Sequence, residues 1–248
     1  MILLTTILLA SLLLSLNVLF RAKLLHRTWG TLNGYAVTCI LSRLSNVFLV
    51  QRDGLTVLVD SGLAQRRAKL DKRLRRYGVM RIDYLVLTHS HFDHAGNAAH
   101  IRRAYGAQVV IHRAEAQMLA RGQSAPFVGA SKLWRWLMRS AYGFNPTFEP
   151  CPPDIVVDDR HQLDGPGITL MHTPGHTSGS ISAIVDGHVA LVGDVLLGVF
   201  SFSINNPFAE SPELMRSSWQ KLLKTHCRLF LPGHGSLKRL AHLRWALR

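Results

Sequence analysis

Three histidines and an aspartate fall within six positions of the stretch Thr88-His89-Ser90-His91-Phe92-Asp93-His94. The apolar run Ile82–Leu87 comes directly before them and is typical of a buried strand, so the cluster is expected at a strand tip. His89 and His91 are two positions apart, which places them on the same side of an extended chain. Imidazole and carboxylate ligands suit zinc-like divalent ions, and the absence of cysteine from the cluster argues against a closed structural site.

One such cluster is too small to hold two metal ions, but further potential ligands follow along the chain. They are His176 in Thr173-Pro174-Gly175-His176-Thr177, Asp194 after Gly193, and His234 in Pro232-Gly233-His234-Gly235. Each comes after an apolar, strand-like run, namely Ile168–Met171, His188–Val192 and Arg228–Leu231. Four strand ends therefore supply five histidines and two aspartates to one predicted site, whereas a lone histidine after a strand is usually a surface or core residue.

This set, in this order, resembles the HxHxDH motif with downstream His, Asp and His of the metallo-β-lactamase-fold hydrolase superfamily. The resemblance covers the chain from about Tyr35 onward. It implies that His89, His91 and His176 bind a first metal ion, that Asp93, His94 and His234 bind a second, and that Asp194 bridges the two. The expected cofactor is a pair of divalent ions, zinc in the first instance, with manganese or iron as alternatives.

Two further residues are predicted to support the ligands without binding metal. Asp60 follows the strand-like run Leu55–Val59, and the resemblance implies that its carboxylate orients the metal site. Thr88, directly before the first ligand, is assigned a similar role. The alternative for Asp60 is a purely structural role in capping the turn Asp60-Ser61-Gly62.

The ligand set and the resemblance together predict a dinuclear metal-dependent hydrolase. Metal ions that keep open coordination positions lower the pKa of bound water, and a hydroxide bridging them would attack a carbonyl carbon. Asp93 would act as the catalytic residue, since it can both bind the second metal and hold the proton of the nucleophile. The expected small-molecule substrate is an ester, thioester or lactone, amphiphilic acyl compounds included. No GxSxG motif or Cys-His arrangement offers a competing nucleophile.

The residue types at two positions favour some branches of the resembling superfamily over others. The diiron flavoprotein branch usually has glutamate where His91 stands, and true β-lactamases generally lack the aspartate found at Asp194. That aspartate resembles the glyoxalase II, lactonase and phosphodiesterase branches. The alternatives are a phosphodiesterase acting on lipid or nucleotide, β-lactam hydrolysis and, outside the enzymes, a metal-binding module without turnover. A nucleic-acid partner is not expected, and the sequence gives no oligomeric state.

Residues 2–20 form an almost continuous apolar run without a charged side chain. As a helix this run would rise about 28 Å, close to the hydrocarbon thickness of a bilayer. No basic residue precedes it, and Arg21, Lys23 and Arg27 follow it, which favours an uncleaved anchor over a cleaved signal peptide. We therefore expect residues 1–27 to be a membrane anchor with a basic flank and the catalytic domain to be cytoplasmic. Export by a cleaved signal peptide is the alternative.

The chain has a formal net charge of +14, and much of the positive charge is concentrated between residues 66 and 81. The basic residues there are Arg66, Arg67, Lys69, Lys72, Arg73, Arg75, Arg76 and Arg81, opposed only by Asp71. Such a run fits a solvated helix face, anionic lipid head groups or nucleic-acid phosphates. Together with the apolar N-terminal run, it predicts a membrane surface as a partner.

Strand-like and helix-like segments alternate through residues 28–248, which predicts one mixed α/β (α+β) domain with helical layers covering sheet. The resemblance implies a four-layer αββα sandwich with the site along one edge of both sheets, preceded by the N-terminal hydrophobic helix. Asp53-Gly54 and Asp186-Gly187 predict hairpin turns. Residues 121–153, rich in proline and aromatic side chains, are predicted to form a cap or substrate-facing insertion. A lid packed on the core, or a segment in a membrane interface, is the alternative.

Overall fold

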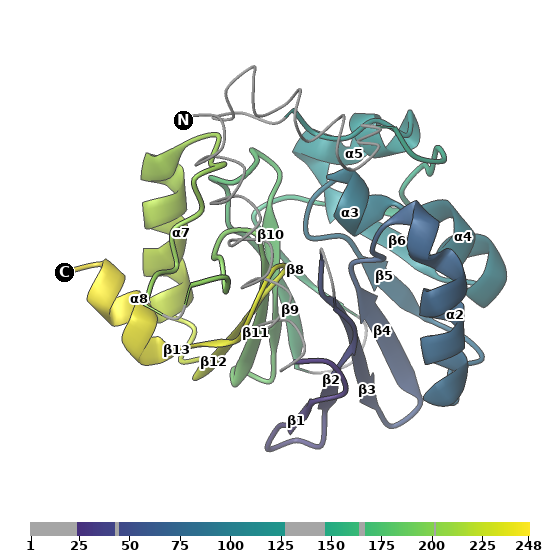
Figure 1. The fold of residues 1–248 in the computed structure, drawn as a ribbon, viewed down its shortest axis with the longest axis horizontal. Coiled ribbons are helices and arrows are strands. Elements are labelled where there is room, and N and C mark those ends of the chain that lie inside the picture. Colours follow the sequence, from purple (N-terminus) through teal and green to yellow (C-terminus); the bar gives the residue numbers. More distant parts are fainter. Residues whose placement is uncertain (1–23, 43–44, 127–146, 164–166, 201) are drawn as a thin grey trace, which may run out of the picture.

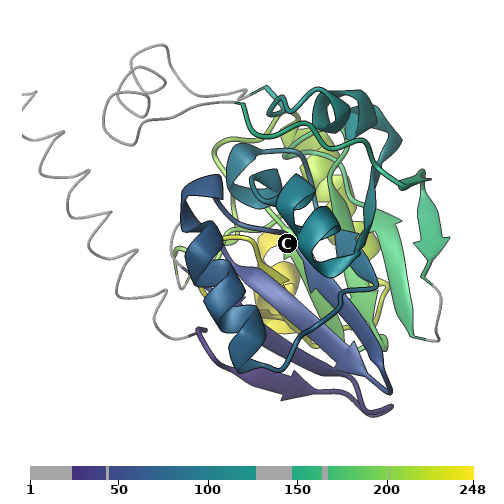
Figure 2. The same cartoon turned by 90° about the vertical axis from the view of Figure 1, so that its right-hand side faces the viewer.

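Two β-sheets face each other between outer helices in the computed structural model, which describes residues 24–42, 45–126, 147–163, 167–200 and 202–248 (Figure 1). Helices α2 to α5 lie on the side of one sheet and α7 and α8 on the side of the other (Figure 1). The view turned by 90° shows α2 and the strands of the first sheet running alongside each other (Figure 2). This arrangement confirms the predicted mixed α/β fold with two sheets.

The first sheet has seven strands that lie side by side in the order of the sequence. They are β1 (Thr28–Gly30), β2 (Ala36–Leu41), β3 (Val47–Arg52), β4 (Leu55–Val59), β5 (Tyr84–Val86), β6 (Gln108–His112) and β7 (Ile155–Val157). Strands β1 to β4 pair antiparallel, whereas β4 to β7 pair parallel because helices connect them. The predicted turn between β3 and β4 is present, with positive φ at both Asp53 (44°) and Gly54 (83°).

The second sheet has six strands in the order β13-β12-β11-β10-β9-β8. They are β8 (Arg160–Gln162), β9 (Ile168–His172), β10 (Ile181–Val185), β11 (Val189–Gly193), β12 (Leu229–Pro232) and β13 (Lys238–Arg239). The predicted hairpin joins β10 and β11 through Asp186 (φ 55°) and Gly187 (φ 58°). Strands β11 and β12 pair parallel, and α7 (Pro212–Leu223) connects them.

The remaining helices are η1 (Ala64–Arg66), α2 (Arg67–Arg76), α3 (Phe92–Ala95), α4 (Ala98–Tyr105), α5 (Arg113–Ala120) and α8 (Leu240–Ala246). Their apolar faces explain the layers. Along β4, Val57 and Val59 belong to a buried cluster shared by both sheets, whereas Leu58 belongs to a second cluster with Leu70 of α2. A third cluster contains residues of the second sheet together with Trp219 of α7. Three apolar interfaces therefore separate helix, sheet, sheet and helix.

Helices follow the first ligand cluster directly. Phe92–Ala95 forms α3, so Asp93 lies inside a short helix, and Ala98–Tyr105 forms α4. Helix α5 was not predicted at all. The cap or insertion predicted at residues 121–153 stays a prediction, because residues 127–146 lie outside the described residues.

The predicted membrane helix at residues 2–20 also lies outside the described residues. Within the described part of the chain, no helix has the length and apolar character needed to cross a bilayer. The longest of these helices, α7, has 12 residues and rises only about 18 Å. The prediction of a membrane-anchored enzyme with a membrane partner is therefore wrong. The predicted location in the cytoplasm and the alternative of export both rested on that segment and are withdrawn with it.

Candidate metal centre

The seven predicted ligands follow the ends of four strands, one in the first sheet and three in the second. The cluster His89 to His94 comes after β5, and His176, Asp194 and His234 come after β9, β11 and β12. Backbone hydrogen bonds hold the loops together. The Asp60 N–H donates to Val86 O (2.9 Å), and the Gly233 N–H donates to Gly193 O (2.7 Å). Residues far apart in the sequence thus meet at one edge of both sheets.

The first donor group consists of three buried imidazoles. His89 Nε2 lies 2.9 Å from His91 Nδ1, and His176 Nε2 lies 3.0 Å from the same atom. Nitrogen ligands about 2.0–2.1 Å from a tetrahedral zinc ion are separated by roughly 3.3 Å, so these spacings are close to those of a metal site. Burial, followed by the charges of neighbouring histidines, holds the pKa of His89 and of His91 well below the usual range, and burial also lowers the pKa of His176. Neutral imidazoles are the form that binds metals.

The second donor group consists of Asp93, His94 and His234. The distances are 3.3 Å from His94 Nε2 to His234 Nε2 and 3.4 Å from His234 Nε2 to Asp93 Oδ2. Asp194 lies between the two groups. Its Oδ2 is 3.2 Å from His234 Nε2 and 3.6 Å from His176 Nε2, and its Oδ1 is 3.6 Å from His94 Nε2. The structure thus brings all seven side chains together, in sets of three that are each compatible with a metal ion.

The carboxylates dominate the electrostatics of the second group. Burial disfavours protonation of His94, but the charges of Asp60, Asp93 and Asp194 outweigh it and raise the pKa of His94 to about 10. Burial is likewise outweighed at His234, where Asp194 raises the pKa. Conversely, His234 and His94 overcome burial and hold the pKa of Asp194 well below its usual range. The carboxylates therefore require a nearby positive charge, which protons or a metal cation can supply.

A buried oxygen of Asp194 provides an independent test of whether a cation fits. Asp194 is only 6% exposed, and among the described residues its Oδ1 has no hydrogen-bond partner. A buried carboxylate oxygen without a donor is costly unless a cation balances it. Because the surrounding donors are imidazole nitrogens and carboxylate oxygens, the residues fit divalent ions such as zinc.

Asp60 and Thr88 fix the orientation of one histidine in each donor group. Asp60 accepts hydrogen bonds from the Thr88 N–H (2.8 Å) and hydroxyl (3.0 Å) and from His94 Nδ1 (2.8 Å). Since the Thr88 hydroxyl donates to Asp60, it accepts from His89 Nδ1 (3.0 Å). Both His89 and His94 thereby carry their proton on Nδ1 and present Nε2 to the site. Asp60 has a left-handed backbone (φ 62°), a strained conformation of the kind found at functional sites.

Two positioning residues were missed by the sequence analysis. The buried Glu115 of α5 accepts hydrogen bonds from the Ser90 N–H and from the Thr177 hydroxyl, and so ties the first ligand loop to the loop of His176. Burial raises the pKa of Glu115 although these hydrogen bonds oppose the shift. Asn206 donates through Nδ2 to Asp194 O (2.8 Å), and the same nitrogen lies 3.1 Å from His176 Nδ1. A lone glutamate or asparagine is ordinarily exposed, so no sequence signal could have identified them.

Gly233 is required by the close approach of the two donor groups. A Cβ atom at this position would lie 2.4 Å from Asp194 Oδ1 and 2.6 Å from His94 Cε1. Any larger residue before His234 would therefore displace two of the predicted ligands.

Comparison with known proteins agrees with this geometry. A family model described as the metallo-beta-lactamase superfamily matches residues 42–234. A probable metallo-hydrolase of Methanocaldococcus jannaschii is 28% identical over 167 residues, covering 66% of this chain and 70% of the relative. The acyl-coenzyme A thioesterase MBLAC2 of Bos taurus is 30% identical over 172 residues, covering 61% of this chain but only 58% of the thioesterase.

Solved structures show the same fold. The metallo-beta-lactamase MIM-1 of Novosphingobium pentaromativorans superposes with a TM-score of 0.64 at 20% identity, over 90% of this chain and 86% of that one. At this identity the likeness concerns the fold alone. The family model, however, spans well over half of the chain and includes the loops of all seven predicted ligands. The chain therefore belongs to the metallo-beta-lactamase superfamily and is a metal-dependent hydrolase of that family.

Proposed function

We propose that this protein is a two-metal hydrolase that cleaves acyl esters and, above all, acyl thioesters. The observation that carries the proposal is the position of Asp194, whose two oxygens lie 3.2–3.6 Å from nitrogens of both donor groups. One ion would be held by His89, His91 and His176, and the other would be held by Asp93, His94 and His234. Asp194 would contact both ions. Divalent ions bound there supply a water of lowered pKa and polarise the carbonyl group.

The exposed side of the cluster indicates where substrate approaches. The side chains of His234 (19% exposed) and Asp93 (13%) are more accessible than those of His94 (0%), His176 (2%) and Asp194 (8%). Asp93 Oδ2 lies 3.4 Å from His234 Nε2 on this open side. The Asp93 carboxylate is therefore placed to accept the proton of the attacking water and to pass it to the leaving group.

An apolar rim on the segment that is hydrogen-bonded to the His234 loop supports an acyl substrate. Phe200 (39% exposed) and Phe202 (73%) have ring centroids 5.8 Å apart. The segment that carries them is pinned to the ligand loop, because the Gly198 N–H donates to His234 O (2.8 Å) and Leu197 N–H to Ile204 O (2.9 Å). Exposed aromatic rings at the edge of a polar site offer an apolar contact for an acyl chain. The thioesterase relative acts on acyl-coenzyme A, which favours the same bond type. Membership of a glyoxalase II or lactonase-like branch stays a prediction.

Removal of the apolar rim should affect long acyl chains selectively. In a Phe200→Ser, Phe202→Ser variant we expect the KM for long-chain acyl esters to rise about tenfold, because burying each methylene contributes about 0.8 kcal/mol. The KM for acetyl esters should stay unchanged. Met80→Ser is the matched control, since Met80 is 84% exposed but lies after α2, away from the centre. Equal KM changes for short and long chains would contradict an acyl-binding role of this rim.

The proposed reaction is tested with a substrate panel on metal-loaded and chelated protein. The panel contains p-nitrophenyl acyl esters, a lactone, an acyl thioester and bis-p-nitrophenyl phosphate, with metal content measured in parallel by mass spectrometry. We expect two metal ions per chain and chelator-sensitive turnover of acyl substrates, with thioesters cleaved fastest. Turnover of the phosphodiester alone, or turnover that survives chelation, would refute the proposal.

A further inference from the structure

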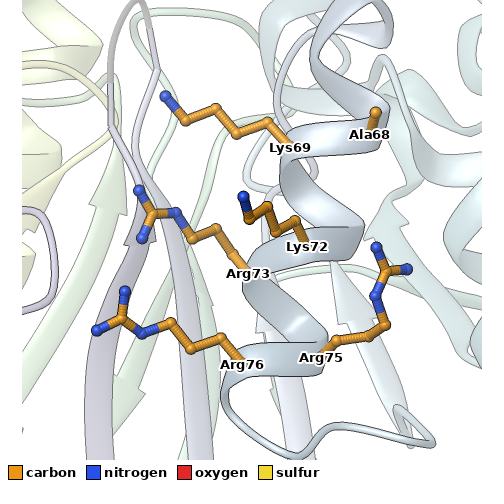
Figure 3. A pocket seen from close by; sticks show the side chains of 6 residues that line it. All are labelled: Ala68, Lys69, Lys72, Arg73, Arg75 and Arg76. Atoms are coloured by element: carbon orange, nitrogen blue, oxygen red, sulfur yellow. The ribbon is translucent and has the colours of Figure 1, made fainter.

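Five basic side chains of α2 line a surface hollow of about 860 Å³, and Figure 3 shows them along the helix. The hollow is lined by Ala68, Lys69, Lys72, Arg73, Arg75 and Arg76. We call these five basic residues the α2 basic face. Figure 3 shows Lys69, Arg73 and Arg76 extending to the same side of the helix, whereas Arg75 extends to the other side. Because like charges three and four residues apart repel each other, their clustering does not stabilise the helix itself.

Three charges of the α2 basic face lack the acidic partners that several arginines elsewhere have. Five other arginines each pair with an acid: Arg52 with Asp53, Arg81 with Asp83, Arg102 with Asp154, Arg103 with Glu149 and Arg113 with Asp158. By contrast, no carboxylate of the described residues lies within ion-pair distance of Lys72, Arg75 or Arg76. The acidic residue of α2, Asp71, is engaged elsewhere, by His100 (2.8 Å) and the Tyr105 hydroxyl (3.1 Å).

The positive potential of this face is felt by its neighbour His26. The Arg73 guanidinium contacts His26 Nε2, and His26 Nδ1 is 2.8 Å from the Tyr77 hydroxyl. Burial, followed by the charges of Arg73 and Arg76, lowers the pKa of His26. The favourable interaction of cations with the C-terminal end of a helix accounts for Arg73, Arg75 and Arg76 of the last turn, but it does not account for Lys72.

The dimensions of the face indicate the size of its ligand. From Lys69 to Arg76 the helix rises about 10 Å. At its N-terminal end the face stops where Arg67 pairs with Glu149 (3.6 Å). A hollow of this volume lies within the range of small-molecule pockets, roughly 300–1,000 Å³. A nucleic-acid duplex carries a charge about every 1.7 Å and needs a longer basic track to neutralise it.

We propose that the α2 basic face binds a compact polyphosphate, which arginine and lysine recognise through charge-assisted hydrogen bonds. During turnover, the bound polyphosphate would be part of the carrier group of an acyl thioester substrate. This assignment of the carrier rests on the proposed function. Phosphates and thioester must then be joined by an extended arm, since the two sites are separate.

The N-terminal end of α2 is linked to the metal centre by consecutive hydrogen bonds. Arg67 Nε donates to Asn97 Oδ1 (3.5 Å), Asn97 Nδ2 donates to Ser61 O (2.9 Å), and the Ser61 N–H donates to His94 O (2.7 Å). From Arg67 to Arg73 the helix rises about 9 Å. The N-terminal end of α2 is therefore tied to the ligand loop of His94, and the basic face lies on the helix that leads away from it.

Two charge-matched double variants test the binding site. Lys72→Gln with Arg76→Gln removes two charges from the face, whereas Arg81→Gln with Arg113→Gln removes two charges elsewhere. Titration calorimetry measures tripolyphosphate binding to the metal-loaded full-length chain, and orthophosphate serves as the single-phosphate probe. Neither double variant changes a predicted metal ligand, so binding of phosphate at the metal centre should be the same in both. We expect tripolyphosphate to bind about tenfold more weakly to the first variant and within about twofold of the wild type to the second.

Equal losses in both variants would show a general charge effect and overturn the site, as would unchanged binding in the first. Tighter binding of a single-stranded oligonucleotide or of anionic vesicles, lost in the first variant only, would overturn the choice of a compact ligand.

The carrier assignment is tested by kinetics. The KM for acyl-coenzyme A should rise about tenfold in the first variant, whereas the KM for the same acyl group on a phosphate-free thiol should not change. Equal KM values would refute the carrier assignment, whereas absence of any acyl hydrolysis would refute the proposed function and leave the binding result standing.

Discussion

An Asp194→Asn variant is expected to lose hydrolytic activity by about 10³-fold or more, because metal ions contribute several kcal/mol to transition-state stabilisation and about 1.4 kcal/mol corresponds to a tenfold rate. The amide keeps the shape of the carboxylate but not its charge. Asp194 Oδ2 and Oδ1 lie close to His234 and His94, and no other described residue contacts both donor groups with a carboxylate. We therefore expect the variant to bind fewer metal ions than the wild type, measured by mass spectrometry after gel filtration.

The control for this variant is Asp158→Asn. Asp158 is an exposed carboxylate that pairs with Arg113 (2.7 Å), away from the metal centre. Its replacement should leave metal content and kcat/KM within about twofold of the wild type, since exposed ion pairs contribute little. Circular dichroism would show that both variants fold. An Asp194→Asn protein that retained two metal ions and full activity would exclude a shared ligand and with it the two-metal proposal.

The positions of the candidate ligands could be predicted from the sequence because local signals mark them. Apolar runs followed by polar side chains gave the strand ends before His89, His176, Asp194 and His234, and the structure places strands β5, β9, β11 and β12 there. Asp-Gly pairs gave the two hairpins, since type I′ turns need positive φ at both central residues. These features depend only on a few neighbouring residues.

Features that depend on distant contacts could not be predicted. Glu115 is buried because Ser90 and Thr177 both donate to it, and nothing near it in the sequence marks those partners. Asn97 lies between α3 and α4, and its side chain donates to Ser61 O and Leu63 O (2.9 and 2.8 Å), more than thirty residues away. Tertiary contacts of this kind override local helix propensity.

The error about the membrane has a different origin. The hydropathy and length of residues 2–20 are compatible with a bilayer-spanning helix, but they do not require one. The basic run at residues 66–81 was assigned to a membrane surface only because of that segment. The structure shows that most of this run is the helix α2, with Leu70 and Leu74 buried. Its basic face, however, surrounds a hollow of small-molecule size, and charge alone does not name a partner.

Asp60→Asn is expected to weaken the binding of both metal ions, by about 10- to 100-fold each, which is the usual effect of losing an outer hydrogen-bond partner. Asp60 accepts from His94 Nδ1 and from the Thr88 hydroxyl, which in turn orients His89. An asparagine has one acceptor oxygen and must direct its NH₂ group at one of these donors. The histidine on that side then turns its protonated nitrogen toward the site, and the other histidine keeps its hydrogen bond but loses the negative charge that makes it a stronger ligand. Asparagine tolerates the left-handed backbone of Asp60, so the turn itself should survive.

A Thr88→Val variant separates the two branches of this network. It removes the hydroxyl that orients His89 but leaves the 2.8 Å contact of Asp60 with His94 intact. Stepwise metal titration against a chelating dye should therefore show one weakened site in Thr88→Val and two in Asp60→Asn. Thr88→Ser keeps the hydroxyl and should bind both ions as the wild type does. If Asp60→Asn weakened only one site, or if Thr88→Val weakened both equally, the two histidines would not be oriented independently through Asp60. If all three variants bound metal normally, the network would have a structural role alone.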